Sequence, residues 1–154
     1  MAVYKVLVLP DPVLRSKAKP VANINQGVIR LLDNMIDTMY EYNGVGLAAP
    51  QIGVSRRVVV FDVGEGPVEL INPEIIEQEG EQLGLEGCLS IPDTQGQVRR
   101  ANRVVVEALN RKGEMFRLQG VGLTARVIQH EIDHLDGILF IDRAESLLRN
   151  NGRI

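Results

Sequence analysis

The sequence predicts an α+β protein in which mainly antiparallel sheets surround a helix near the C-terminus, with a long N-terminal helix packed outside. Two observations lead to this class. Segments 25–44 and 123–137 show the three-and-four spacing of apolar residues that is typical of amphipathic helices. Between them lie several short, β-branched segments that no helical pattern separates. Because parallel strands need long crossover connections, we expect these strands to pair antiparallel.

The composition is that of a single globular domain spanning residues 1–154, with residues 149–154 as a flexible tail. A chain of 154 residues with 45% apolar and 24% charged residues can bury a real core. The net charge of −3 gives no reason to expect nucleic-acid or anionic-membrane binding. The short apolar run before Pro10 matches neither a secretory signal nor a membrane span. One cysteine forms no internal disulfide, so we expect a cytoplasmic protein.

The first long helix is predicted to begin after Asn25, whose side chain is well suited to cap a helix N-terminus. Its apolar residues fall on one face and predict a buried stripe, and Asn43-Gly44 ends it. Residues 44–51 then read Gly-Val-Gly-Leu-Ala-Ala-Pro-Gln. These small residues allow close approach of the backbone to a ligand, and Gln51 offers an amide donor.

The middle of the chain is predicted to be rich in strands. Residues 74–82 are charged and alternate in part, which is typical of an edge strand. Residues 110–113 form a turn between two strands, and residues 144–148 are expected to add a short helix. The expected strands are 57–63, 68–71, 74–82, 104–109 and 115–118.

The last long helix carries a His-Glu-x-x-His motif. It is expected to end at Gly137, and it contains His130 and His134, the only two histidines of the chain. Residues four apart lie on one face of a helix, so both imidazoles can bind one metal ion. Glu131 lies beside them, where it can handle a metal-bound water without being a ligand.

A catalytic site of this kind needs a third protein ligand, and the sequence offers two sources. Asp136, Asp142 and Glu145 follow the motif, as in zinc peptidases, whereas Cys88 precedes it and would supply a softer thiolate. Spacing alone does not choose between them. The chemistry is the same in either case, because the metal lowers the pKa of its water and the nearby glutamate accepts a proton.

The expected reaction is hydrolysis of an amide. The attacked carbonyl becomes an oxyanion, which needs fixed donors, and Gln51 together with the backbone N–H that follows Cys88 are the candidates. A metal-dependent peptidase with a downstream carboxylate ligand is an alternative. A non-catalytic module in which a closed metal site stabilises the fold is another.

Three stretches taken together resemble the motifs of bacterial peptide deformylases, in the same order: 44–51, 86–90 and 129–134. The resemblance covers nearly the whole chain. It implies that Cys88, rather than a downstream carboxylate, completes the metal site with His130 and His134. It also implies that Glu131 is the general base and acid, and that Gln51 and the Leu89 N–H hold the oxyanion.

The resemblance also implies the substrate and the cofactor. Members of the family remove the N-formyl group from the initiator methionine of nascent chains by attack of a metal-bound hydroxide, and formate is released. One divalent ion per chain is expected, with Fe²⁺ first and Zn²⁺, Ni²⁺ or Co²⁺ as substitutes. The partners expected are formyl-Met nascent peptides, with a transient ribosome association that a basic tail (Arg143, Arg149, Arg153) would assist. Substrate contacts are expected from Val45, Gly46, Gly87 and Val127.

Overall fold

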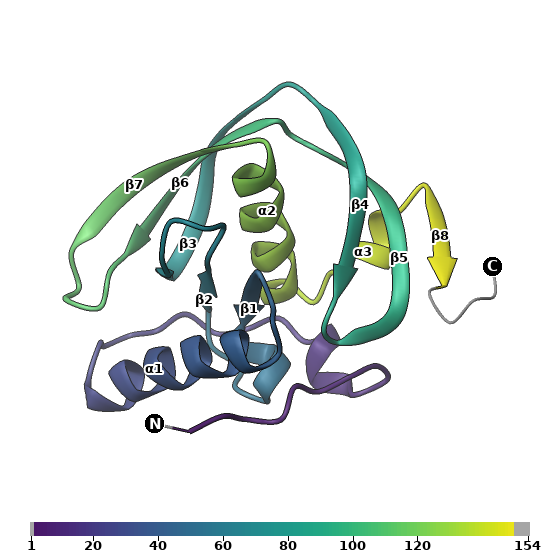
Figure 1. Ribbon diagram of the computed structural model, residues 1–154. Coiled ribbons are helices and arrows are strands. Elements are labelled where there is room, and N and C mark those ends of the chain that lie inside the picture. The colour runs from purple at the N-terminus through teal and green to yellow at the C-terminus, as the bar shows by residue number, and fades with distance from the viewer. Residues whose placement is uncertain (1, 150–154) are drawn as a thin grey trace.

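Helix α2 (Leu123–Leu135) lies at the centre of the fold, with sheet strands on both sides of it (Figure 1). The computed structural model describes residues 2–149. One sheet has five strands in the order β1-β2-β3-β6-β7, and the other has three in the order β4-β5-β8. Every pair of neighbouring strands is antiparallel. The predicted α+β class with mainly antiparallel sheets is confirmed.

The other elements follow the chain from the N-terminus. They are η1 (Pro12–Arg15), α1 (Gln26–Glu41), β1 (Gly46–Ala48), η2 (Ala49–Ile52), β2 (Val58–Phe61), β3 (Val68–Glu79), β4 (Gln82–Cys88), β5 (Ile91–Arg100), β6 (Arg103–Leu109), β7 (Met115–Val121), α3 (Phe140–Arg143) and β8 (Ser146–Arg149).

Strand β2 explains why α1 and α2 lie on opposite faces of the five-stranded sheet. All four of its residues are at most 1% exposed. Because side chains alternate along a strand, Val59 and Phe61 pack in the cluster that contains α2, whereas Val58 and Val60 pack in the cluster that contains α1. A strand buried on both faces has a continuous apolar sequence, which is why this strand was predictable.

Helix α1 begins and ends as its sequence predicts. The side chain of Asn25 accepts a hydrogen bond from the Val28 backbone N–H at 3.1 Å, and so caps the first turn. At the other end the Gly44 N–H donates to the Met39 carbonyl at 2.9 Å. Figure 1 shows α1 below the five-stranded sheet, outside α2.

Strands β4 and β5 form a long hairpin that the sequence patterns did not predict. Glycines at 84, 87 and 96 lower its strand propensity, and its polar residues mask the alternation. The short helix predicted at 144–148 was wrong. Strand β8 occupies this segment, because β5 supplies backbone partners such as Gly96, which pairs with Leu147. The predicted tail extends to residues 150–154, which lie outside the described range.

The described helices include none that is long and apolar enough to span a membrane.

Gly137 ends α2 and fixes the turn that follows its last histidine. Its φ is +73°, and a Cβ built there would lie 2.5 Å from the backbone oxygen of Arg15. Replacing Gly137 by alanine is therefore expected to lower the free energy of unfolding by about 2–4 kcal/mol, through left-handed strain plus a backbone clash. Thermal unfolding followed by circular dichroism measures this loss.

Gly64→Ala is the matched control for this prediction. Gly64 also has a positive φ, of +107°, but a Cβ there would meet no atom within 4 Å. Its cost should be limited to backbone strain, about 1 kcal/mol. Equal losses in the two variants would contradict the proposed clash.

Candidate active site

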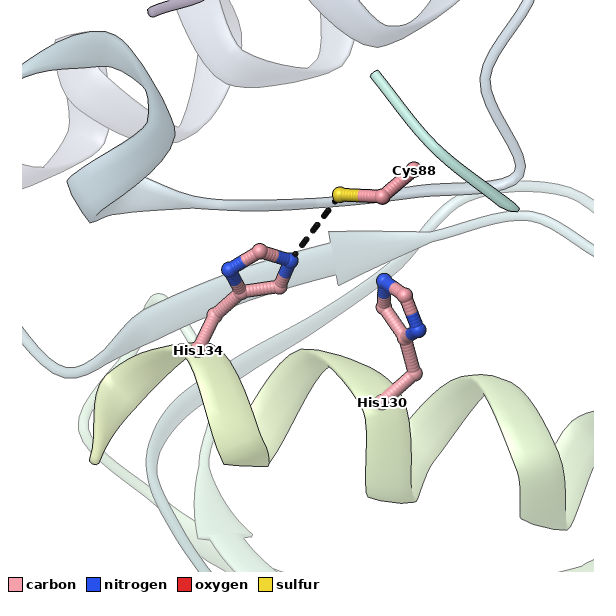
Figure 2. Close-up of side chains that lie close together, drawn as sticks. All are labelled: Cys88, His130 and His134. Atoms are coloured by element: carbon pink, nitrogen blue, oxygen red, sulfur yellow. Dashed lines mark hydrogen bonds between the residues drawn. The ribbon is translucent and has the colours of Figure 1, made fainter. Parts of the chain in front are cut away.

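Three side chains from two elements converge at the centre of the fold (Figure 2). His130 and His134 project from the same face of α2, and Cys88 comes from the end of β4. One ligand atom from each residue lies within 4.8 Å of the others, and Cys88 Sγ is 3.3 Å from His134 Nε2. A thiolate and two imidazoles facing one point fit a divalent transition-metal ion.

His130 is held by a buried carboxylate. Its Nδ1 donates to Glu86 Oε1 at 2.8 Å, which leaves Nε2 without a proton and available to an ion. Arg100 donates to both oxygens of Glu86 at 2.8 Å, and Arg126 Nη1 donates to Glu86 Oε2 at 2.6 Å. Burial alone would raise the pKa of Glu86, but the hydrogen bonds from Arg100 and His130 outweigh it and lower this pKa to about 2.

The charge of Glu86 is expected to stabilise the fold in a pH-dependent way. Its folded-state pKa of about 2 lies below the ordinary value of 4.5, so the stabilisation is present above pH 4.5 and is lost as the pH falls towards 2. The difference corresponds to about 3 kcal/mol. Glu86→Gln should therefore lower the urea midpoint at pH 7, and the gap from the unmodified protein should shrink at pH 3.

The control for this prediction is Glu145→Gln, a half-exposed carboxylate that pairs with Arg99. It should change the urea midpoint little at either pH, because exposed ion pairs contribute little. A gap for Glu86→Gln that stays constant from pH 7 to pH 3 would contradict the assigned titration.

The helix that carries the histidines is fixed to its surroundings along its length. The side-chain amide of Gln129 donates to the Ala101 carbonyl at 2.9 Å and accepts from the Ala101 N–H at 3.1 Å. At the C-terminal end Arg57 Nη1 donates to the Leu135 carbonyl at 3.0 Å. These bonds satisfy polar groups that the helix leaves unpaired and keep the two imidazoles in place.

The three downstream carboxylates lie in ion pairs instead of beside the histidines. Asp136 pairs with Arg57, Asp142 with Arg15, and Glu145 with Arg99. Within residues 2–149, the one cluster of potential metal-ligating side chains is Cys88, His130 and His134. The ligand set that sequence spacing left open is thus narrowed by the fold to the set with the cysteine.

Glu131 lies in the same pocket and is 4% exposed. Burial raises its pKa to about 7, with smaller opposing effects from neighbouring charges. Its Oε1 has no hydrogen-bond partner among residues 2–149. A carboxyl group with this pKa can accept or release a proton near neutral pH.

Gly46 leaves the room that Glu131 occupies. A Cβ at residue 46 would lie 2.5 Å from Glu131 Oε2 and 3.0 Å from its carboxyl carbon. Gly46→Ala is expected to displace this carboxyl group and to lower turnover about 100-fold, since small misplacements of a reacting group are costly. The metal content should not change, because Gly46 touches none of the three potential ligands at these distances.

Gly27→Ala on the exposed surface of α1 is the control and should leave turnover unchanged. Turnover of Gly46→Ala within threefold of the unmodified protein would show that the carboxyl group does not need this space.

Gln51 is held with its amide group facing the cysteine. Its Oε1 accepts from the Ala48 N–H at 2.9 Å, and its Nε2 donates to Ser90 Oγ at 3.1 Å. Nε2 also lies 3.5 Å from Cys88 Sγ. The two flanking bonds fix which end of the amide is the donor, and Leu89 lines the pocket beside it.

A cavity of about 400 Å³ opens over these groups, a size typical of a small-ligand site. Its apolar residues include Val45 and Leu123, which are 45% and 58% exposed and lie at the surface. All ten residues nominated from the sequence lie at this cavity except His134, which lies beneath it. The nine that line it are Val45, Gly46, Gln51, Gly87, Cys88, Leu89, Val127, His130 and Glu131.

The sequence analysis missed the residues that hold this site together. Glu86, Arg100, Arg126 and Ser90 are all buried and bond to a nominated residue or to one another. The one sequence signal was the position of Glu86, two residues before the cysteine. The two arginines had none, because they meet Glu86 only in the folded chain.

Comparisons with known proteins agree with this geometry. Residues 3–150 match the family model described as polypeptide deformylase. The peptide deformylase of Carboxydothermus hydrogenoformans is 60% identical over 149 residues, which cover 97% of this chain and 98% of that protein. The one from Desulfitobacterium hafniense is 61% identical over 149 residues, 97% and 99% of the two chains.

Solved structures show the same fold. The crystal structure of peptide deformylase from Thermotoga maritima has a TM-score of 0.93 and 46% identity, and the match covers 95% of this chain and 100% of that one. A peptide deformylase from Synechococcus elongatus in complex with actinonin has a TM-score of 0.90 and 42% identity, over 93% and 79% of the two chains. The chain therefore belongs to the polypeptide deformylase family and is a metal-dependent hydrolase that removes the N-formyl group from the N-terminal formylmethionine of nascent polypeptides.

Proposed function

We propose that this chain deformylates nascent peptides with one divalent ion held by Cys88, His130 and His134. The observation that supports this most directly is the convergence of the three ligand atoms within 4.8 Å, at a cavity that also contains Glu131. When bound, the ion supplies the Lewis acidity that makes water a competent nucleophile at neutral pH.

We propose Fe²⁺ as the resident ion, with Zn²⁺, Ni²⁺ or Co²⁺ able to replace it. One thiolate and two imidazoles suit all four ions, so affinity alone does not select one. Glu86 supports any of them in the same way, because it fixes His130 through Nδ1.

Glu131 is the group that moves the proton. It accepts a proton when water attacks the formyl carbon and returns it to the departing amine. Its buried position excludes bulk water from this carboxyl group, and its pKa of about 7 suits both roles. Gly46 keeps the space beside it open.

The developing negative charge on the formyl oxygen needs donors that are already in place. We assign these to Gln51 Nε2 and to the Leu89 backbone N–H. Gln51 has little freedom, since the bonds to Ala48 and Ser90 hold both ends of its amide. A preorganised donor of this kind does not have to reorient during the reaction.

The methionine side chain of the substrate is assigned to the apolar part of the cavity. Val45 and Val127 line it from the two sides of the site, and Gly46 and Gly87 leave their backbone open to the peptide. Asp93, Thr94 and Gln95 also line the cavity, so no cation lies on that side to hold the rest of the peptide.

We further propose that residues 1–154 form one catalytic domain that works in the cytoplasm on chains leaving the ribosome. Of the basic residues proposed to assist, Arg143 pairs with Asp133. The side chain of Arg149 and residue Arg153 lie outside the described part of the chain.

The test is release of formate from a formyl-Met-Ala peptide by protein purified without oxygen, alongside metal analysis. We expect about one iron per chain, loss of turnover on chelation, and its return when Fe²⁺, Co²⁺, Ni²⁺ or Zn²⁺ is added. A metal-loaded protein that releases no formate would overturn the proposed activity, and a resident metal other than iron would overturn the assigned ion.

A further inference from the structure

Arg126 forms a charged part of the wall of an otherwise largely apolar pocket. It belongs to α2, directly before Val127, and lines the same cavity as Val45, Leu85 and Leu123. The side chain is nevertheless buried, with 6% of Arg126 exposed. Arginine is rarely buried unless its donors are paired, so the partners of each nitrogen decide what this residue does.

Two of the three guanidinium nitrogens are paired. Nη1 donates to Glu86 Oε2 at 2.6 Å and to the Val98 carbonyl at 2.9 Å, and Nε donates to Gln82 Oε1 at 3.2 Å. Nη2 is buried and has no acceptor among residues 2–149. A buried donor without a partner destabilises the site, and a ligand atom that accepts its hydrogen bond removes that penalty.

Gly84 is matched to this nitrogen. A Cβ at residue 84 would lie 3.1 Å from Arg126 Nη2 and 3.3 Å from its Cζ. The guanidinium group therefore occupies the space that a side chain on β4 would otherwise fill. With Gly84 above it and two other nitrogens bonded, Nη2 has one position.

We propose that Arg126 Nη2 is a specificity-determining donor, which favours a formylated N-terminal residue whose side chain ends in a hydrogen-bond acceptor. The inference rests on the proposed function, because it places the first side chain of the substrate in this cavity. The thioether sulfur of methionine is a weak acceptor. Norleucine has nearly the same shape without an acceptor, and methionine sulfoxide has a stronger one.

The experiment compares kcat/KM for three peptides that differ only at this residue: formyl-Met-Ala, formyl-norleucyl-Ala and formyl-Met(sulfoxide)-Ala. Unmodified protein should prefer methionine over norleucine about threefold, the effect of a weak hydrogen bond. In Arg126→Leu this ratio should fall to about one, and the sulfoxide-to-norleucine ratio should fall about tenfold. Ratios within one variant cancel any damage to the metal site caused by losing the bond to Glu86.

Arg126→Lys separates selectivity from structural support. Its ammonium group can replace Nη1 beside Glu86 but supplies no group at the position of Nη2. It should keep more overall turnover than Arg126→Leu and yet show the same loss of selectivity. Arg117→Leu, an exposed arginine on β7, should leave all ratios unchanged.

The proposal is overturned if the ratios of Arg126→Leu or Arg126→Lys stay within twofold of the unmodified protein. It is also overturned if unmodified protein prefers norleucine. Failure of the proposed function would look different, because the unmodified protein would then release no formate from any of the three peptides.

Discussion

Replacing Glu131 by alanine is expected to lower formate release by a factor of about 10²–10⁴ while the metal is retained. The carboxyl group is 4% exposed, and its pKa of about 7 allows it to hold a proton during one half of the reaction. It is not needed to bind the ion, because the potential ligand atoms belong to other residues. Activity and metal content should therefore separate in this variant.

Glu131→Gln refines the same experiment. Glutamine keeps the size of the side chain next to Gly46 but cannot accept the proton. If proton transfer is the role, this variant should be nearly as inactive as the alanine variant. If the side chain only fills space, it should retain most of the activity.

Formate release and metal analysis of the same preparations measure both effects. Glu81→Ala serves as the control, since Glu81 is an exposed carboxylate that pairs with Arg99. Turnover of Glu131→Ala within tenfold of the unmodified protein would remove Glu131 from the assigned role.

The parts of the fold that the sequence predicted are those with a local pattern. Helix α2 repeats apolar residues at helical spacing, and β2 is a continuous β-branched run because both its faces are buried. The hairpin of β6 and β7 has a turn sequence between two strands. Each of these signals depends on neighbouring residues alone.

The parts that were missed depend on partners far along the chain. Strand β8 was predicted as a helix, but β5 provides its hydrogen bonds, about fifty residues earlier. The same is true of the site. The three motifs contain the residues that face the cavity, whereas Arg100 and Arg126 reach Glu86 only because β4, β5 and α2 pack together. No spacing rule relates these positions.

Replacing Cys88 by alanine is expected to remove most of the metal and, with it, the activity. Two imidazoles would remain, and the site would lose its one thiolate, which is also its one anionic candidate ligand. Losing one of three protein ligands should weaken binding by more than the 10–100-fold that is typical of changing a supporting residue. Metal content after dialysis should fall from about one ion per chain to less than about 0.1.

The nearby carboxylates are not expected to rescue this variant. Asp136 is paired with Arg57 at 3.0 Å, and moving it to the histidines would break a pair that also helps to fix the end of α2. Asp136→Ala is therefore the informative control: it should keep its metal if the thiolate is the ligand, and lose it if the site resembles that of a zinc peptidase. A Cys88→Ala protein that keeps its metal through dialysis would contradict the thiolate assignment. With both variants, the choice between cysteine and carboxylate, which sequence spacing left open, becomes a direct measurement of bound metal.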